Sequence, residues 1–287
     1  MISDSDSHPL LLLDAYNLLF RAFASLPAAI VDEGGRPINA VYGMVSTVVK
    51  LVRQFAPSGV VAAFDEPDVP TFRHRLYPDY QGHRGPLGGD NAEDFARQVD
   101  LARHALPHLG IPAPSLTGYE ADDVMGSLAC SVSAPALVVS TDRDLLQLVS
   151  PRIGVLSPSD KEMRVQVAAA VEARMGVPPG GITTFKALAG DASDHIPGVA
   201  GIGTKTATAL VQNYGTLDTI FANLSRLPPR QARALEAGKE DAYLFHKVVT
   251  IVTDLELPLS CADIPAPQVS GDSRITEVLR RAGIERK

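Results

Sequence analysis

Three short apolar runs in the first half of the chain each lead to aspartates. They are Leu10–Leu13, Val60–Phe64 and Ala136–Val139, and they lead to Asp14, to Asp65, and through Ser140-Thr141 to Asp142 and Asp144. Uninterrupted apolar runs separated by helix-length segments are typical of parallel strands buried on both faces. A single aspartate after a strand is usually turn chemistry. Because the pattern recurs, and ligands bind beyond the carboxyl ends of such strands, it favours a common site at that edge of the sheet.

The remaining segments predict the rest of the fold. Apolar residues recur at helical spacing in Ala15–Ala24, Val41–Phe55 and Asn91–Leu109, whereas Arg152–Leu156 indicates a further strand. After Pro178-Pro179-Gly180-Gly181 the strand signals largely stop. We therefore predict an α/β core with a mostly parallel sheet over residues 10–178, a helical region over residues 179–287, and a disordered polar tail over residues 1–9.

The stretch Gly118–Gly126 places Glu120, Asp122 and Asp123 within four residues. If a helix begins at Ala121, Glu120 and Asp123 share one face and Asp122 is rotated about 100° from Asp123, so that one helix could address two neighbouring cations. The alternative is that acids simply gather in a first helical turn, where they complement the helix dipole. A further pair of acids, Asp191 and Asp194, opens the helical region. Ligand sets made only of oxygen suit Mg²⁺ or Mn²⁺.

Residues 67–89 form a local basic and aromatic patch. Arg73, His74, Arg75, His83 and Arg84 are interleaved there with Phe72, Tyr77 and Tyr80. Guanidinium groups suit phosphates and aromatic rings suit unstacked bases, so the patch predicts contact with single-stranded nucleic acid. An ordinary solvated loop is the alternative. The glycines between Gly82 and Gly89 favour a mobile loop that orders on its substrate.

The Gly-rich run Ile196–Ala207 fits neither a Walker A loop nor GxGxxG. It matches the hairpin of a helix-hairpin-helix element over residues 190–215, which would grip one DNA strand by its backbone. Glycines let backbone N–H groups approach a phosphate at a helix N-terminus. We expect four residues to contact the DNA: Gly198, Gly201, Gly203 and Lys205. A plain helix-to-helix turn is the alternative.

Composition narrows the class of protein. The chain has 287 residues, 45% of them hydrophobic, and no apolar stretch near the ~18 residues that cross a bilayer, so we expect a globular protein without a membrane partner. Cys130 and Cys261 form no metal or redox motif and the start lacks a leader pattern, which predicts a cytoplasmic location. The net charge of −7 would become +2 without the nine acids named above, so metal ions could reconcile this acidic chain with a polyanionic substrate.

Together these motifs resemble the 5′ nuclease and flap endonuclease family, especially the 5′ nuclease domain of bacterial DNA polymerase I and its stand-alone bacterial relatives. The resemblance covers most of residues 10–210 in the family's order. Its segments are LLLDAYNLLFRAFASLP (Leu11–Pro27), VVAAFDEP (Val60–Pro67), TFRHRLYPDYQGHR (Thr71–Arg84), GYEADD (Gly118–Asp123), STDRDLLQLV (Ser140–Val149) and GDASDHIPGVAGIGTKTA (Gly190–Ala207).

The resemblance implies a PIN-like sheet, an arch over residues 67–89, and a structure-specific 5′ nuclease that uses two metal ions in DNA replication and repair. It implies that Asp14, Asp65, Glu120 and Asp122 lie mainly around one Mg²⁺ or Mn²⁺, and that Asp123, Asp142, Asp144, Asp191 and Asp194 lie around another. Arg84, and also Arg73, would stabilise charge on the phosphoryl group. The implied partners are K⁺ at the hairpin, DNA with a 5′ flap or a 5′ end at a single-strand/duplex junction, and a separate DNA polymerase. We expect a monomer.

The sequence departs from the family pattern at three positions. Gln81 follows Tyr80 where the YKxxR motif has lysine, Ala15 replaces the glycine after Asp14, and His195 replaces an asparagine. Gln81 keeps open a catalytically weakened DNA-binding scaffold, and a PIN-type ribonuclease is a second alternative that the run Gly190–Ala207 disfavours. Because all nine acids are present, we expect an active enzyme with slower or altered chemistry. Asp123→Asn or Asp142→Asn should then abolish cleavage but not DNA binding.

Overall fold

A five-stranded sheet forms the centre of the molecule, in the order β2-β1-β3-β4-β5. The computed structural model describes residues 8–67, 69–82, 85, 88–158, 163–269 and 275–285. The strands are β1 (Leu10–Asp14), β2 (Gly59–Ala63), β3 (Ala136–Val139), β4 (Ile153–Leu156) and β5 (Val165–Gln166). The first four are parallel, and β5 is antiparallel to β4. The predicted α/β class with a mostly parallel sheet is confirmed, although β5 was not predicted.

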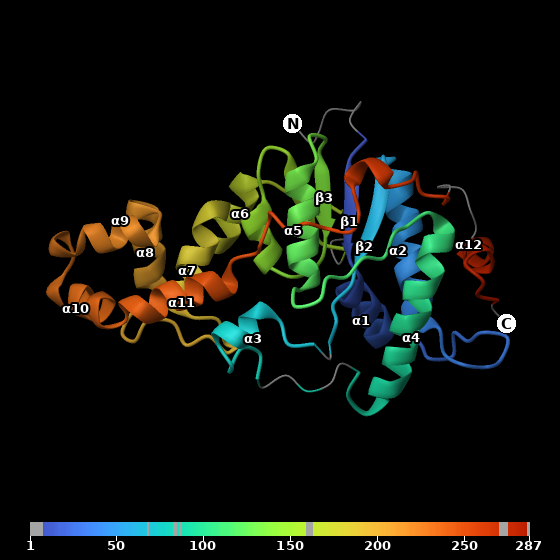
Figure 1. Cartoon of the computed structure of the whole chain (residues 1–287), viewed down its shortest axis with the longest axis horizontal. Coiled ribbons are helices and arrows are strands. Elements are labelled where there is room, and N and C mark those ends of the chain that lie inside the picture. The colour runs from blue at the N-terminus through green and yellow to red at the C-terminus, as the bar shows by residue number, and fades with distance from the viewer. Residues whose placement is uncertain are drawn as a thin grey trace.

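Helices cover both faces of this sheet (Figure 1). The layer on one face contains α1 (Ala15–Ser25), α2 (Asn39–Phe55) and α4 (Ala92–Ala105), and α12 (Ile275–Arg281) packs against α2. Against the other face pack α5 (Ala121–Ser131) and α6 (Ala168–Met175). Leu11 and Leu13 belong to the first apolar core and Leu10 and Leu12 to the second, because alternate residues of a strand point to opposite faces. Burial of both faces explains the uninterrupted apolar run.

The helical region forms a smaller body at one end of the molecule (Figure 1). It contains α7 (Ile182–Ala189), α8 (Thr204–Tyr214), α9 (Leu217–Ala222), α10 (Pro229–Ala237) and α11 (Lys239–Val249). Leu188, Ile202, Leu210 and Leu235 are among the residues of its own apolar core. Within the described residues, no helix is both long and apolar enough to cross a membrane.

Residues 72–82, the first part of the predicted arch, connect the sheet to the helical region. They begin with the short helix α3 (Phe72–Leu76). Tyr80 packs in an apolar cluster with Ala187, Ile196 and Phe245, and the backbone N–H of Gln81 donates to the carbonyl of Asp194 at 3.1 Å. The base of the arch is therefore docked on α7, α11 and the hairpin. Residues 68, 83, 84, 86 and 87 lie outside the described residues, as do residues 1–7 of the predicted tail.

Candidate metal centre

Seven of the nine predicted acids line one cavity of about 640 Å³ at the carboxyl edge of the sheet. They are Asp14, Asp65, Glu120, Asp122, Asp142, Asp144 and Asp194. Asp14 ends β1, whereas Glu120 and Asp122 come from the start of α5. Parallel strands end at the same edge, so residues far apart in the sequence converge there.

Five of these residues form what we call the sheet-side acids: Asp14, Asp65, Glu120, Asp122 and Asp142. Neutral donors hold several of them, Asp14 and Asp65 among them. Asp14 accepts hydrogen bonds from the Ser140 hydroxyl at 2.7 Å and the Asn17 N–H at 3.0 Å, and Asp65 accepts from the Ala121 N–H at 2.8 Å. These contacts fix the side chains without balancing their charge.

Three of the sheet-side acids, Asp14, Glu120 and Asp122, bind protons more tightly than isolated carboxylates do. Burial, followed by repulsion from Asp65 and Asp142, raises the pKa of Asp14 to about 7, although hydrogen bonds oppose the shift. Burial also raises the pKa of Glu120 to about 7 against the attraction of Arg73. For Asp122, burial and the neighbouring acids raise the pKa well above its usual value. A bound cation would relieve this repulsion.

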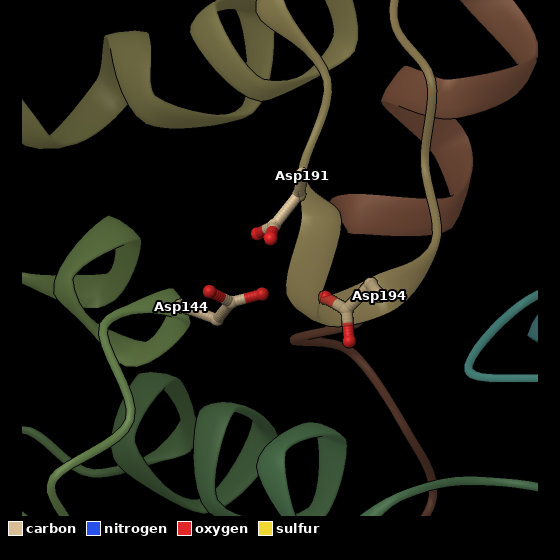
Figure 2. A group of neighbouring side chains, drawn as sticks. All are labelled: Asp144, Asp191 and Asp194. Carbon is tan, nitrogen blue, oxygen red and sulfur yellow. The ribbon is translucent and has the colours of Figure 1, made fainter. Parts of the chain in front are cut away.

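The remaining acids that meet here are the hairpin-side acids Asp144, Asp191 and Asp194. Asp144 begins the 3-10 helix η3 (Asp144–Leu148), and the other two flank the short turn before the hairpin. One carboxylate oxygen from each lies within 4.8 Å of the others, and no other such group of three occurs in the described part of the chain. In Figure 2 the carboxylates of Asp144 and Asp191 point toward each other across a narrow gap. This is a ready arrangement for a divalent cation.

Lys186 is a member of this site that the sequence analysis missed. It lies on α7 with only 6% of its surface exposed, and its ammonium group forms ion pairs with Asp144 and Asp191. Burial acts to raise the pKa of Asp191, but Lys186 and hydrogen bonds from Ser193 hold it below its usual value. Burial outweighs the same lysine at Asp144, whose pKa is raised to about 7. The one signal in the sequence was a lysine within an otherwise apolar helical run.

The structure places Asp123 apart from the seven acids that line the cavity, although the sequence predicts it as a metal ligand. It is fully buried, and its carboxylate accepts from both terminal nitrogens of Arg73, at 2.6 and 2.8 Å. The N–H groups of Glu120 and Val252 also donate to it, at 3.0 and 2.9 Å. With these four donors its oxygens are committed within the protein. Asp123 therefore fits the alternative interpretation, in which an acid stabilises the first turn of the helix. Glu120 and Asp122, in contrast, line the cavity.

Arg73, predicted to stabilise charge on the phosphoryl group, is paired within the protein. Its side chain is 3% exposed, and besides Asp123 it donates to the carbonyls of Val248 and Thr250 at 2.9 and 3.2 Å. One terminal nitrogen lies 3.3 Å from Glu120. A guanidinium with all these partners positions α3, α5 and the strap at residues 248–252, and it is not free to bind a phosphate. Arg84 lies outside the described residues.

The predicted hairpin residues lie between α7 and α8. Gly198 and Gly201 have φ angles of +71° and +86°, which favour glycine. A Cβ at Gly198 would collide with the backbone of Leu188–Gly190, so the close approach of these two backbone segments requires glycine at this position. Gly203 is the N-cap of α8, and Lys205 is exposed in its first turn. The hairpin thus presents backbone N–H groups and a lysine on the surface.

Comparison with known proteins connects this geometry to a family. Residues 9–176 match the model of the 5′-3′ exonuclease N-terminal resolvase-like domain, and residues 177–272 match the 5′-3′ exonuclease C-terminal SAM fold. The chain belongs to the 5′-3′ exonuclease family. The expected relationship to the 5′ nuclease domain of DNA polymerase I is confirmed by its relatives.

Within the 5′-3′ exonuclease family, the chain is 37% identical over 251 residues to the thermostable DNA polymerase I of Thermus filiformis, covering 86% of this chain and 29% of that protein. It is 37% identical over 254 residues to DNA polymerase I of Mycobacterium tuberculosis, covering 86% of this chain and 28% of the relative. The chain therefore spans less than a third of the length of these polymerases.

Solved structures share the 5′-3′ exonuclease fold. The T5 5′-exonuclease with bound zinc ions has a TM-score of 0.70 and 23% identity, covering 96% of this chain and 100% of that one. A bacteriophage T5 flap endonuclease in complex with DNA and metal ions also has a TM-score of 0.70, at 22% identity, covering 96% of this chain and 100% of that one. Flap endonuclease-1 from Methanococcus jannaschii has a TM-score of 0.60 and 16% identity, covering 96% of this chain and 91% of that one.

In this member of the 5′-3′ exonuclease family, Gln81 bridges the two groups of acids. Its side-chain amide donates to Asp194 at 3.0 Å and to the hydroxyl of Tyr80 at 2.9 Å, and that hydroxyl donates to Glu120 at 3.2 Å. Its φ angle of +54° is unusual for a residue with a side chain. Gln81 therefore connects the acids by hydrogen bonds and adds no charge.

Proposed function

We propose that this chain is a divalent-metal-dependent, structure-specific nuclease that hydrolyses DNA phosphodiesters at 5′ flaps and 5′ ends, in replication and repair. The observation that carries the proposal is the convergence of eight acids from the sheet edge, α5, η3 and the hairpin on one site. So many carboxylates beside one cavity disfavour folding unless cations bind among them.

The donor set fits Mg²⁺ or Mn²⁺, because it consists of carboxylate oxygens with no sulfur or imidazole ligand. The sheet-side acids would hold one ion and the hairpin-side acids a second. Such ions, when bound, activate the attacking water and stabilise charge on the leaving oxygen. The protein's own part is to fix the carboxylates: Ser140 and Asn17 orient Asp14, and the start of α5 orients Asp65.

The surroundings of the cavity suit a DNA strand that leaves a duplex. Phe20 lines the cavity and is 38% exposed, so its ring is available to stack on an unpaired base. At the other end of the site, the hairpin with Gly198, Gly201, Gly203 and Lys205 would hold the duplex by its phosphates. The proposal includes a K⁺ ion bound at this hairpin. The solved T5 flap endonuclease complex with DNA and metal ions supports this choice of substrate.

A panel of labelled substrates tests the proposal. A 5′-labelled DNA flap, a blunt duplex and a single RNA strand would each be incubated with the chain and Mg²⁺, and the products sized. We expect cleavage near the flap junction, slower release from the blunt 5′ end, and little cleavage of RNA. Binding without cleavage would identify the scaffold alternative that Gln81 keeps open, and preferred cleavage of RNA would identify a ribonuclease.

A further inference from the structure

The buried lysine on α7 is not explained by packing alone. Residues around Lys186 on this helix, such as Ile182, Ala187 and Leu188, are fully buried and apolar. An ammonium group in such a place destabilises the fold unless it is paired. Both of its ion-pair partners, Asp144 and Asp191, belong to the hairpin-side acids. The lysine is therefore held by the candidate metal site itself.

The ammonium group contacts the same carboxylates that a second ion would need. It pairs with Oδ1 of Asp144 and Oδ2 of Asp191, while Oδ1 of Asp191 accepts from Ser193 at 2.8 Å. The third acid, Asp194, accepts from Gln81 at 3.0 Å. A divalent ion placed among these oxygens would lie within a few ångströms of the ammonium and be repelled by it.

No lysine plays this role among the sheet-side acids in the described part of the chain. The guanidinium of Arg73 reaches Glu120 at its edge, but it is already paired with Asp123 on two nitrogens. The hairpin-side acids also form the only close trio of ligand oxygens within the described ranges. This difference matches the position of the cations, because Lys186 pairs with two of the hairpin-side acids whereas Arg73 meets the sheet-side acids only at Glu120 among the contacts described.

We propose that Lys186 is an internal counter-cation that gathers the hairpin-side acids and leaves them when a second divalent ion binds. The ion at the sheet-side acids binds first and tightly, and the second ion binds more weakly because it must displace the ammonium group. This inference rests on the proposed function in one respect, since it takes both groups of acids as metal sites.

The test compares Mn²⁺ binding to the full chain and its variants without DNA, with free Mn²⁺ followed by electron paramagnetic resonance. In wild type we expect one tight and one weak site. Lys186→Met removes the charge and keeps most of the side-chain volume, so the second dissociation constant should fall about tenfold or more. Lys186→Arg should resemble wild type, as should Lys50→Met, a control at an exposed position on α2.

An unchanged or weakened second site in Lys186→Met would overturn the inference. Two equally tight sites in wild type would do the same and leave the proposed function standing, whereas absence of any Mn²⁺ binding would overturn both.

A second measurement on the wild-type chain decides the question even if Lys186→Met does not fold. With ¹⁵N-labelled lysine, the buried Lys186 ammonium should give a protected Nζ resonance that is missing in Lys186→Arg. Saturating Mg²⁺ should shift or abolish this resonance. A resonance that stays in place while two ions bind would contradict displacement.

Discussion

The sheet-side and hairpin-side acids balance their charge in different ways. Neutral donors hold Asp14, and a tyrosine hydroxyl and a shared guanidinium contact Glu120. The pKa of each of these two acids is raised, as is that of Asp122. Asp191 lies against Lys186, and its pKa is lowered. Burial nevertheless raises the pKa of Asp144, which pairs with the same lysine, to about 7. The hairpin-side acids thus hold a buried ammonium group of the chain between two of their members, whereas the sheet-side acids meet Arg73 at Glu120. Aspartates at one site can thus have pKa values shifted in opposite directions. We expect a bound divalent ion to change the two groups to different extents.

The largest expected effect is on cleavage after loss of one sheet-side acid. Asp122→Asn should reduce flap cleavage by about 10³-fold or more, because several kcal/mol of transition-state stabilisation by an ion would be lost. Asp142→Asn should act in the same direction. Single-turnover rates with a labelled flap measure the effect, and DNA binding in Ca²⁺ should persist. Asp100→Asn, on the exposed surface of α4, is the control. If Asp122→Asn cleaved the flap at the wild-type rate, the sheet-side acids would not be the group on which cleavage depends.

Asp123 offers a contrast within the same helix, because its partner is Arg73. Asp123→Asn should lower the free energy of unfolding by about 3–5 kcal/mol, since it removes the carboxylate charge that pairs with both terminal nitrogens of the buried Arg73. Urea unfolding measures this change, and Mn²⁺ titration should still find two sites. The surface pair Glu277–Arg281 is a matched control, for which Glu277→Gln should cost about 0.5 kcal/mol or less. Normal stability with loss of one metal site would restore the sequence-based assignment of Asp123 as a ligand.

The raised pKa values predict that stability without metal depends on pH. Asp14, Glu120 and Asp144 have a folded-state pKa of about 7, above the values near 4 of the unfolded chain. The folded state therefore holds more protons between these values, so its stability falls as pH rises from about 4 to 7. In EDTA the melting temperature should fall by about 5 °C or more over this range.

Mg²⁺ or Mn²⁺ at pH 7 should reverse that fall, because the ion binds the folded carboxylates. A melting temperature in EDTA that rises over the same range, or one that millimolar Mg²⁺ leaves unchanged, would count against a preformed acidic site.

The smallest effect is expected at the bridge between the two groups. Gln81→Lys would place an ammonium near Asp194 and the reacting phosphate, and should raise the rate of flap cleavage by up to about tenfold. Gln81→Met, which removes the hydrogen bonds to Asp194 and Tyr80 without adding charge, separates the effect of the charge from that of the bridge. Equal rates in wild type and Gln81→Lys would show that the lack of a positive charge at position 81 does not limit the rate of flap cleavage.

The strand-end aspartates could be predicted because their position depends on local pattern. An apolar run fixes the strand, and parallel strands bring Asp14, Asp65 and Asp142 to one edge. The trio at the hairpin is part of the group of five acids that the resemblance implied around one ion, but that group also contained Asp123 and Asp142, and Asp142 lies close enough to Asp14 and Asp122 to repel them. These are cases in which the sequence neighbours of a residue decide where it lies.

The pairing of Arg73 with Asp123 was not predicted, because the two residues are 50 positions apart and helical spacing gives the face of a helix but not what covers it. Lys186 was missed because a lysine on an amphipathic helix is usually exposed. The strap at residues 248–252 contacts Arg73, Asp123 and Gln147 largely through its backbone N–H and carbonyl groups, which no side-chain pattern marks. The short helix α3 was not predicted either, because it is supported by packing against α11 and by the contact of Arg73 with Asp123 on α5.

One measurement tests the central claim most directly: cleavage of a 5′-labelled DNA flap by the wild-type chain in Mg²⁺, in EDTA, and by Asp122→Asn in Mg²⁺. We predict that wild type in Mg²⁺ releases the flap as a labelled product cut near the junction, and that the other two reactions leave it intact. A flap that wild type binds but does not cut in Mg²⁺ or Mn²⁺ would contradict the account, as would cleavage that persists in EDTA.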